Sequence, residues 1–411
     1  MDEQGDRTPS HTPRRTPISL CMIVKDEAER LPQCLESVRP LVSELIVVDT
    51  GSTDETVAIA QSFGAKTYDF PWNHNFSDAR NESLKYATGD WVLVLDADEV
   101  LTPSVIPLIQ QAVEKPDYLA INLLRHEVGA TQSPYSLVSR LFRRHPEICF
   151  QRPYHAMIDD SVADLLQREP HWQIGELPQV AILHYGYEPG AIATRDKYEK
   201  ARTTMEGFFA AHPDDPYVCS KLGALYVQMG EIEQGMALLE RGLAAPQADA
   251  PVRYELHYHL GIAHARLNHT EQARQHYQAA IQQPILGRLK IGAYNNLGNL
   301  LKSMGDLPGA KRVYQQCITI ASDFAIGHNN LGMTLKAMGE LSAAIAHYQQ
   351  AIALNPSYAE AYQNLGVALL KAGQVPQSLE AFERAIALHS EANPEEAKRL
   401  RRGLLEMGFV V

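Results

Sequence analysis

Two patterns of hydrophobic and polar positions alternate along the first half of the chain. Several short runs are apolar almost without interruption, as is typical of strands buried on both faces of a parallel sheet. These strands are predicted at residues 18–24, 44–48, 66–70, 91–95 and 179–184. Helices with an apolar stripe are predicted at about 27–38, 54–64 and 77–87. Because strands and helices alternate, we predict an α/β domain with a largely parallel sheet.

The second half follows a different, repeating pattern. A helix is expected as a linker over 191–212, and Leu-Gly pairs then recur. The Leu-Gly pairs begin at Leu222, Leu260, Leu297, Leu331 and Leu365, and the last two intervals are 34 residues. Small and aromatic residues follow each pair at fixed offsets, a pattern that resembles the tetratricopeptide (TPR) repeat. We expect an all-α superhelix of five repeats over 213–393, the first two divergent, and then a capping helix and tail over 394–411.

Charge and composition exclude several classes of protein. The formal charge is −12, from 37 basic and 49 acidic residues, which argues against broad binding of nucleic acid or of anionic membranes. Five cysteines without C-x-x-C spacing fit free thiols in a reducing compartment. No apolar run approaches the length of a transmembrane segment. We expect a cytoplasmic protein with a disordered leader over residues 1–16.

The candidate chemistry lies at the end of the run that begins at Trp91. Asp96 and Asp98 follow the apolar residues directly, where open α/β sheets bind their ligands. Two carboxylates so close together repel each other unless a cation neutralises them, which favours a divalent metal site. Hard oxygen ligands select Mg²⁺ or Mn²⁺ over zinc. The alternative interpretation is a pair of solvated aspartates in a turn.

Four blocks of the first half resemble family 2 glycosyltransferases of the Rossmann-like GT-A fold, over roughly residues 17–190. The blocks are ISLCMIVKDE, VVDTGSTDET, NFSDARN and WVLVLDADE. The whole chain resembles the branch of this family in which such a domain is joined to C-terminal TPR repeats. The resemblance implies a nucleotide-sugar donor, with a UDP-sugar expected, and Mn²⁺ or Mg²⁺ bound to the donor diphosphate.

The same resemblance implies roles for individual residues. Val24, Lys25 and Glu27 would form part of the nucleotide pocket. Asp49 would contact the uracil or ribose, and Arg80 the base or the diphosphate. Asp96 and Ala97 would contact the donor, and Asp96 and Asp98 would bracket the metal, Asp98 more directly. His184, after the last strand, would be a further metal or diphosphate ligand; a buried, hydrogen-bonded histidine is the alternative.

The sequence departs from the family pattern at the position expected for the general base. A His-Glu pair is expected in the acceptor block, and this chain has His155 and Ala156 there. Asp159 is the nearest candidate for the base that an inverting reaction needs. Nearby Arg140, Arg143 and Arg144 would form an anion-binding patch; for Arg143 and Arg144 a solvated strand edge is the alternative. A domain that has lost turnover and serves as a scaffold is therefore an alternative to the enzyme.

Asparagines in the repeats suggest the kind of partner. Asn296, Asn330 and Asn364 each precede a Leu-Gly pair, on helices expected to line the concave face. This array resembles the asparagine ladder of repeat-bearing protein O-glycosyltransferases, and amides can bind the backbone of an extended peptide. We therefore expect a metal-dependent inverting glycosyltransferase with a protein or peptide acceptor. The remaining alternative is a glycan or lipid-linked sugar as acceptor, with the repeats docking a partner.

Overall fold

The chain forms two compact units in a computed structural model that describes residues 16–130, 132–152, 156–186 and 195–409. The first unit extends to residue 129 and resumes over 135–208, and the second comprises 130–134 and the chain from 209 onward. Helix α6 (Arg195–Ala211) contains the boundary between them. Residues 1–15 of the expected leader, and His155, lie outside the described residues.

The first unit is built on one eight-stranded sheet with the order β3-β2-β1-β4-β7-β6-β8-β5. Its strands are β1 (Ile18–Val24), β2 (Glu44–Asp49), β3 (Lys66–Asp69), β4 (Trp91–Val94), β5 (Glu99–Leu101), β6 (Tyr118–Glu127), β7 (Tyr135–Arg143) and β8 (Gln173–His184). Strands β1 to β4 are mutually parallel, as predicted. Strand β7 joins β4 and β6 in antiparallel pairs, and β5 joins β8 in the same way. The parallel half and the mixed half meet at β4, and the turn that follows β4 carries the Asp-Ala-Asp sequence.

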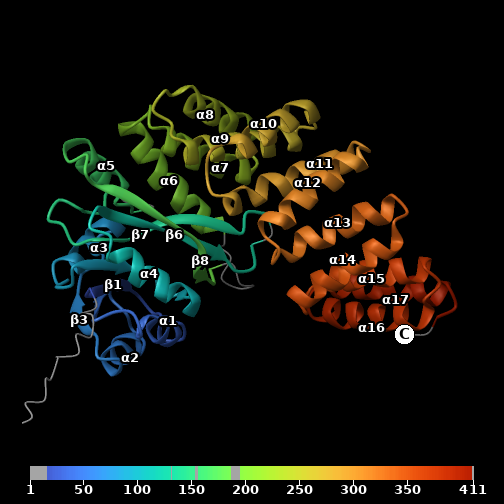
Figure 1. The fold of residues 1–411 in the computed structure, drawn as a ribbon, viewed down its shortest axis with the longest axis horizontal. Helices are drawn as coiled ribbons and strands as arrows, with labels where there is room; N and C mark the ends of the chain where they lie inside the picture. The colour runs from blue at the N-terminus through green and yellow to red at the C-terminus, as the bar shows by residue number, and fades with distance from the viewer. Residues whose placement is uncertain (1–15, 131, 153–155, 187–194, 410–411) are drawn as a thin grey trace, which may run out of the picture. The chain divides into compact units, whose positions relative to one another are not determined.

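Helices cover both faces of this sheet. They are α1 (Leu31–Val38), α2 (Thr56–Ser62), α3 (Phe76–Leu84), α4 (Ile106–Val113) and α5 (Asp159–Arg168). Leu20 and Met22 of β1 pack in the apolar cluster that includes α1, α2 and α4, whereas Cys21 packs in the cluster that includes α5. Figure 1 shows α1 and α2 on one side of β1 and β3 and α5 on the other. Burial on both faces explains why these strands are apolar without alternation.

A single carboxylate ties the starts of the parallel strands together. Glu44, the first residue of β2, accepts hydrogen bonds from Ser19 Oγ of β1 (2.6 Å) and Lys66 Nζ of β3 (3.0 Å). It also accepts from the backbone N–H (2.6 Å) and hydroxyl (2.8 Å) of Thr88, just before β4. Burial would raise the pKa of Glu44, but these hydrogen bonds outweigh it and lower the pKa to about 2. The charged carboxylate therefore stabilises the parallel register.

The second unit consists of paired helices. They are α7 (Pro216–Met229), α8 (Ile232–Ala244), α9 (Ala250–Arg266), α10 (Thr270–Gln282), α11 (Ile291–Ser303), α12 (Leu307–Ile320), α13 (Ala325–Ala337), α14 (Leu341–Leu354), α15 (Ala359–Lys371) and α16 (Val375–Ala392), followed by α17 (Pro394–Glu406). The recurring glycines lie where two helices of a pair approach closely. A Cβ on Gly298 would lie 2.5 Å from the Tyr314 ring, and one on Gly332 2.7 Å from the Tyr348 ring. Among the described residues, no helix is both long enough and apolar enough to cross a membrane.

We predict that Glu44→Gln lowers the melting temperature at pH 7, and that the difference from wild type shrinks as the pH falls. Because the pKa of Glu44 is lowered to about 2 in the folded protein, its contribution is complete above the unfolded pKa of about 4.5 and is lost below it. Thermal melts between pH 7 and pH 3 measure this. The exposed Glu176 makes a matched control, because Glu176→Gln should have little effect at any pH. An equal Glu44→Gln difference at both ends of the pH range would contradict the assignment.

Candidate active site at the ends of β4, β6 and β8

Asp96 and Glu99 close the turn that follows β4. The backbone N–H of Asp96 donates to Glu99 Oε2 (2.9 Å), and the N–H of Glu99 donates to the Asp96 carbonyl (3.0 Å). The Glu99 side chain is fully buried. These two reciprocal bonds fix the backbone around Ala97 and Asp98, so both aspartate side chains leave the strand end in defined directions.

Strand pairing brings His184 to the same turn. His184 is the last residue of β8, and it is paired with Glu99 of β5 on one side and with Glu127, the last residue of β6, on the other. The backbone N–H of Tyr185 donates to the Asp98 carbonyl (3.0 Å). The start of β5 and the ends of β6 and β8 therefore meet beside Asp98, and β6 and β8 are distant from it in sequence.

Asp96 lies between two guanidinium groups. Arg80 Nη2 donates to one carboxylate oxygen and Arg140 Nη2 to the other, each at 2.8 Å. Burial would raise the pKa of Asp96, but the charges of Arg140 and Arg80 outweigh it and hold the pKa well below its usual range. Arg80 also donates to the backbone carbonyl of Ala156 (3.2 Å). Both oxygens of Asp96 are thus engaged with protein cations, so its part in the metal site predicted from the sequence stays a prediction.

Asp98 faces His184 instead. Asp98 Oδ2 lies 3.3 Å from His184 Nε2, and His184 Nδ1 lies 2.5 Å from Glu127 Oε2. Burial would lower the pKa of His184, but its hydrogen bonds to Asp98 and Glu127 raise the pKa to about 9. A carboxylate behind the imidazole fixes the orientation of the ring, as is usual for histidines that ligate metals.

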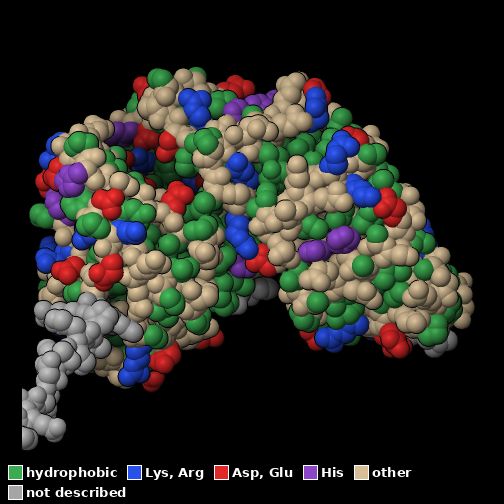
Figure 2. Space-filling model, viewed as in Figure 1, with side chains coloured by type: hydrophobic (Ala, Val, Ile, Leu, Met, Phe, Trp, Pro, Cys, Tyr) green, Lys and Arg blue, Asp and Glu red, His purple; other side chains and the backbone are tan. Residues whose placement is uncertain are grey.

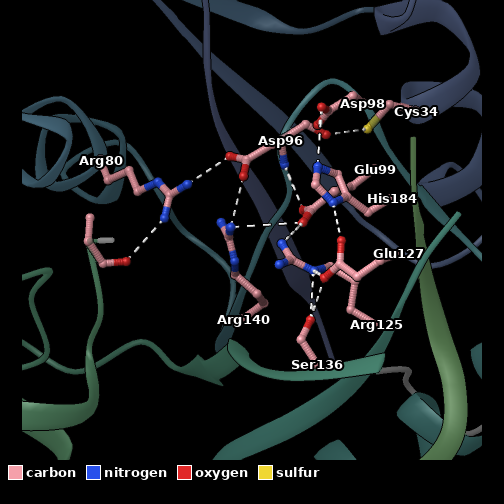
Figure 3. Close-up of polar contacts among 11 residues, drawn as sticks. Cys34, Arg80, Asp96, Asp98, Glu99, Arg125, Glu127, Ser136, Arg140 and His184 are labelled. Atoms are coloured by element: carbon pink, nitrogen blue, oxygen red, sulfur yellow. Dashed lines mark hydrogen bonds and ion pairs between the residues drawn. The ribbon is translucent and has the colours of Figure 1, made fainter. Parts of the chain in front are cut away.

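Buried ion pairs connect the two aspartates, as Figure 3 shows. Arg125 Nη1 donates to Glu99 (2.8 Å) and Arg125 Nε donates to Glu127 (2.9 Å). Glu127 also accepts from the Ser136 hydroxyl (2.6 Å). The chain of contacts runs from Arg80 through Asp96, Arg140, Glu99, Arg125, Glu127 and His184 to Asp98. Positive and negative groups alternate along this chain, so each buried charge in it has a neighbour of opposite charge.

The space in front of Asp98 and His184 depends on a glycine. A Cβ on Gly186 would lie 2.6 Å from His184 Nε2 and 3.5 Å from Asp98 Oδ2. The two donor atoms are 3.3 Å apart, close to the roughly 3 Å between neighbouring ligands of a six-coordinate Mg²⁺. No group of three or more His, Cys, Asp or Glu side chains in the described part of the chain has the arrangement of a metal site. Asp98 and His184 fit a cation that takes its other ligands from a bound diphosphate and water.

The loop after β1 approaches the same place. Val24 ends the strand, Lys25 is exposed, and Glu27 is half-buried. Burial raises the pKa of Glu27, and the nearby negative charge of Asp98 raises it further. Glu27 therefore lies near enough to Asp98 to feel its charge, and the parts predicted for Val24, Lys25 and Glu27 in a nucleotide pocket stay predictions.

The loop after β2 holds Asp49 in a tight turn. Its carboxylate accepts from the backbone N–H groups of Gly51 and Ser52 (3.0 Å each) and from the Ser52 hydroxyl (2.5 Å). Gly51 has a φ of 106°, a conformation that glycine adopts without strain. The N–H of Thr50 donates to the Val24 carbonyl (2.9 Å), which joins this loop to the end of β1. Asp49 is therefore a rigid, nearly buried carboxylate beside the predicted nucleotide pocket.

A bulge in β7 connects Asp159 with the ion-pair chain. Ile121 and Leu123 of β6 are two residues apart, but their partners in β7, Leu141 and Val138, are three residues apart, so β7 contains one extra residue here. The side chains of Val138 and Leu141 still pack in the same apolar cluster. The extra residue lies at Ser139 and Arg140. Ser139 donates to Asp159 (3.0 Å), while Arg140 binds Asp96. Asp159 keeps exposed surface, but the protein atoms around its carboxylate raise the pKa by desolvation. Its role as a base stays a prediction.

The asparagines of the second unit contact one another across repeats. Asn330 Nδ2 donates to Asn295 (2.8 Å), and Asn364 Nδ2 donates to Asn329 (3.1 Å). Asn296 donates to a tyrosine hydroxyl of α9 (3.5 Å). Asn330 is 9% exposed, and the other two predicted asparagines are half-buried. The row therefore links successive repeats, a structural role that the sequence analysis did not include.

Sequence analysis also missed Glu99, Arg125 and Glu127 as parts of the site. One signal was present, because Arg125 and Glu127 are charged residues at the end of the mostly apolar β6. Their partners, however, are fixed by the pairing of β5, β6 and β8, which no local pattern specifies.

We predict that Asp96→Asn destabilises the first unit by about 3 kcal/mol, because Arg80 and Arg140 would remain buried without a carboxylate between them. Asp98→Asn, which removes one partner of a half-buried histidine, should cost under about 1.5 kcal/mol. Urea unfolding of both variants measures the contrast. Equal losses would show that Asp96 is not the residue that holds the site together.

In the second unit, Asn330→Ala should cost about 1–3 kcal/mol, because the buried Asn295 oxygen would lose its donor. Asn364→Ala, at a half-buried position, should cost less. Denaturation of the two variants under identical conditions tests the order. A larger effect of Asn364→Ala would contradict a structural role for the row.

Sequence profiles of known families match both units. The profile of Glycosyl transferase family 2 matches residues 19–175. Tetratricopeptide-repeat profiles match 220–285, 291–322, 332–373 and 359–392. These matches confirm the predicted α/β glycosyltransferase domain and the all-α repeats that follow it.

Individual proteins are similar to the chain as well. A TPR repeat-containing protein of Synechococcus elongatus is 46% identical over 304 residues, which are 74% of this chain and 75% of that protein. Glycosyltransferase SunS of Bacillus subtilis, derived from the SPbeta prophage, is 27% identical over 49% of this chain and 47% of its own. The solved structure of the TPR protein YrrB is 17% identical over 48% of this chain and 97% of its own, with a TM-score of 0.39. The chain therefore belongs to the family 2 glycosyltransferases that carry C-terminal tetratricopeptide repeats.

Proposed function

We propose that this glycosyltransferase is metal-dependent and inverting, and that it transfers a sugar from a UDP-sugar to a protein or peptide acceptor. The observation that carries the proposal is the pair Asp98 and His184, oriented by Glu127 and left accessible by Gly186. Carboxylate and neutral imidazole are both ligands of Mn²⁺, and carboxylate is a ligand of Mg²⁺.

Asp98 and His184 would hold the metal ion. Bound there, the ion would act as a Lewis acid that stabilises the negative charge developing on the diphosphate leaving group. Because the pKa of His184 is raised to about 9, the imidazole carries a proton at neutral pH, and metal binding would displace it. Glu127 stays behind the ring and holds it in place.

The neighbouring residues would bind the rest of the donor. Asp49, at the end of β2, and Lys25, after β1, border the pocket proposed for the nucleoside and its diphosphate. Arg80 would face the base or diphosphate from α3 while Asp96 holds its guanidinium. A fixed guanidinium loses little rotamer freedom when it binds an anion, which favours donor binding.

Asp159 is our candidate for the general base. Inversion requires a carboxylate that accepts the acceptor proton as the new bond forms on the opposite face of the sugar. Desolvation raises the pKa of Asp159, and its side chain keeps exposed surface, which suits a group that must take up a proton. The hydrogen bond from Ser139 would hold it beside Arg140.

The acceptor would be recruited by the repeats. Asn296, Asn330 and Asn364 each use one amide N–H for a neighbouring helix, and the half-buried Asn296 and Asn364 keep exposed surface that an extended peptide backbone would contact. All five cysteines are free thiols, which supports a reducing, cytoplasmic location.

The direct test is binding and hydrolysis of a panel of nucleotide sugars, with and without Mn²⁺. We expect Mn²⁺-dependent cleavage of one UDP-sugar, lost in Asp98→Asn and retained in the control Asp164→Asn, which changes an exposed aspartate of α5. Gly186→Ala should weaken Mn²⁺ binding by about tenfold or more, because the added methyl displaces the His184 ring.

Gly403→Ala is the matched control, since a Cβ there meets no atom within 4 Å. Calorimetry measures Mn²⁺ affinity independently of turnover. Donor binding without cleavage, even with an acceptor present, would favour the scaffold instead. Equal Mn²⁺ affinity in wild type, Asp98→Asn and Gly186→Ala would refute the metal site.

A further inference from the structure

Three lysines lie on the helices that form one layer of the last three repeats. Lys302 follows Gly298 by four residues in α11, Lys336 follows Gly332 by four in α13, and Lys371 ends α15. The asparagine bonds Asn330–Asn295 and Asn364–Asn329 show that these three helices are successive neighbours. Each of the three lysines lies in the last turn of its helix, so all three are at the C-terminal ends of neighbouring helices.

These lysines, like Lys290, have no carboxylate partner among the described residues, whereas three other lysines of the same unit have one. Lys221 pairs with Glu255, Lys311 with Glu340 and Lys398 with Glu395. Lys302, Lys336 and Lys371 form no ion pair with any residue that the structure describes. Figure 2 shows acidic and basic side chains interspersed over the visible face of the repeats, which is the usual arrangement on this protein.

Burial makes the missing partners significant. Lys302 and Lys336 are half-buried. Burial lowers the pKa of both, and the charges of Lys371 and Lys302 lower that of Lys336 further. Lys336 Nζ lies 5.9 Å from the centre of the Tyr348 ring, its one described favourable contact of this kind. Three neighbouring cations without a countercharge are unusual in a chain with a net charge of −12.

We propose that the helix layer bearing Lys302, Lys336 and Lys371 binds an acidic peptide segment of a partner protein. Carboxylates along the segment would neutralise the three lysines, and the asparagine row on the same helices would bind its backbone. The amides distinguish a peptide from a nucleic acid, because they match the alternating donors and acceptors of a peptide chain. This inference deepens the proposed recruitment of an acceptor and adds the chemical class of the recruited segment.

The experiment uses the full chain and fluorescent peptides of alternating Glu and Ser, with an alternating Gln and Ser peptide of the same length as comparison. Anisotropy gives the affinities. We expect the Glu peptide to bind more tightly and to weaken with added salt. The triple variant Lys302→Met, Lys336→Met, Lys371→Met should lose about tenfold or more in affinity. The control triple Lys85→Met, Lys115→Met, Lys398→Met has the same net charge and alters exposed lysines, so it should bind like wild type.

Two further measurements separate binding from folding and from catalysis. The Met triple should melt no lower than wild type, because two of the three charges that it removes are half-buried and unpaired. The single variant Lys336→Glu should weaken binding of the Glu peptide, because a carboxylate there repels it. Hydrolysis of the nucleotide sugar should be unchanged in both, since none of these lysines lies in the first unit. Failure of hydrolysis in wild type would count against the proposed function alone. Equal binding of the Glu and Gln peptides, unaltered binding by the Met triple, or tighter binding of an RNA oligonucleotide would overturn this proposal.

Discussion

The carboxylate of Asp96, held between Arg80 and Arg140, is the interaction on which the rest of the catalytic unit depends. Two buried guanidinium groups repel each other, and a single carboxylate 2.8 Å from each removes that repulsion. The same residue anchors the turn that carries Asp98, through its reciprocal bonds with Glu99. Asp96 and Asp98, two residues apart in one short sequence, thus have different partners: two guanidinium groups in one case and an imidazole in the other.

Asp98 has a different environment from Asp96. Among the described residues its side chain forms an ion pair with His184, and His184 is held from behind by Glu127. Arg125 in turn holds Glu127 and Glu99, so the orientation of the imidazole is transmitted back to the turn after β4. The cost of removing a member therefore depends on its place: Arg80 has Asp96 as its charged partner, whereas His184 keeps Glu127 when Asp98 is replaced.

The repeats use amides in a comparable way. Asn330 and Asn364 connect helices of successive repeats, so the row expected to bind a peptide also stabilises the superhelix. Because repeat proteins are stabilised by contacts between neighbours, substitutions in this row affect folding and binding together. The lysines beside it are free of that structural task, which makes them the sharper probe of partner binding.

Features that depend on local pattern could be predicted without the structure. Buried parallel strands are apolar throughout, and repeats recur at a fixed period, so the α/β domain, the helical repeats and the position of Asp96 and Asp98 could all be predicted. The contacts of Asp98 depend on strand pairing: the family resemblance implied His184 as a ligand, but no local pattern indicated Glu127 behind it. His184 and Glu127 are 57 residues apart, and their contact follows from the pairing of β6 with β8. The bulge that places Ser139 beside Asp159 and Arg140 beside Asp96 likewise depends on how β6 and β7 pair, because register is set by contacts between strands and not within one.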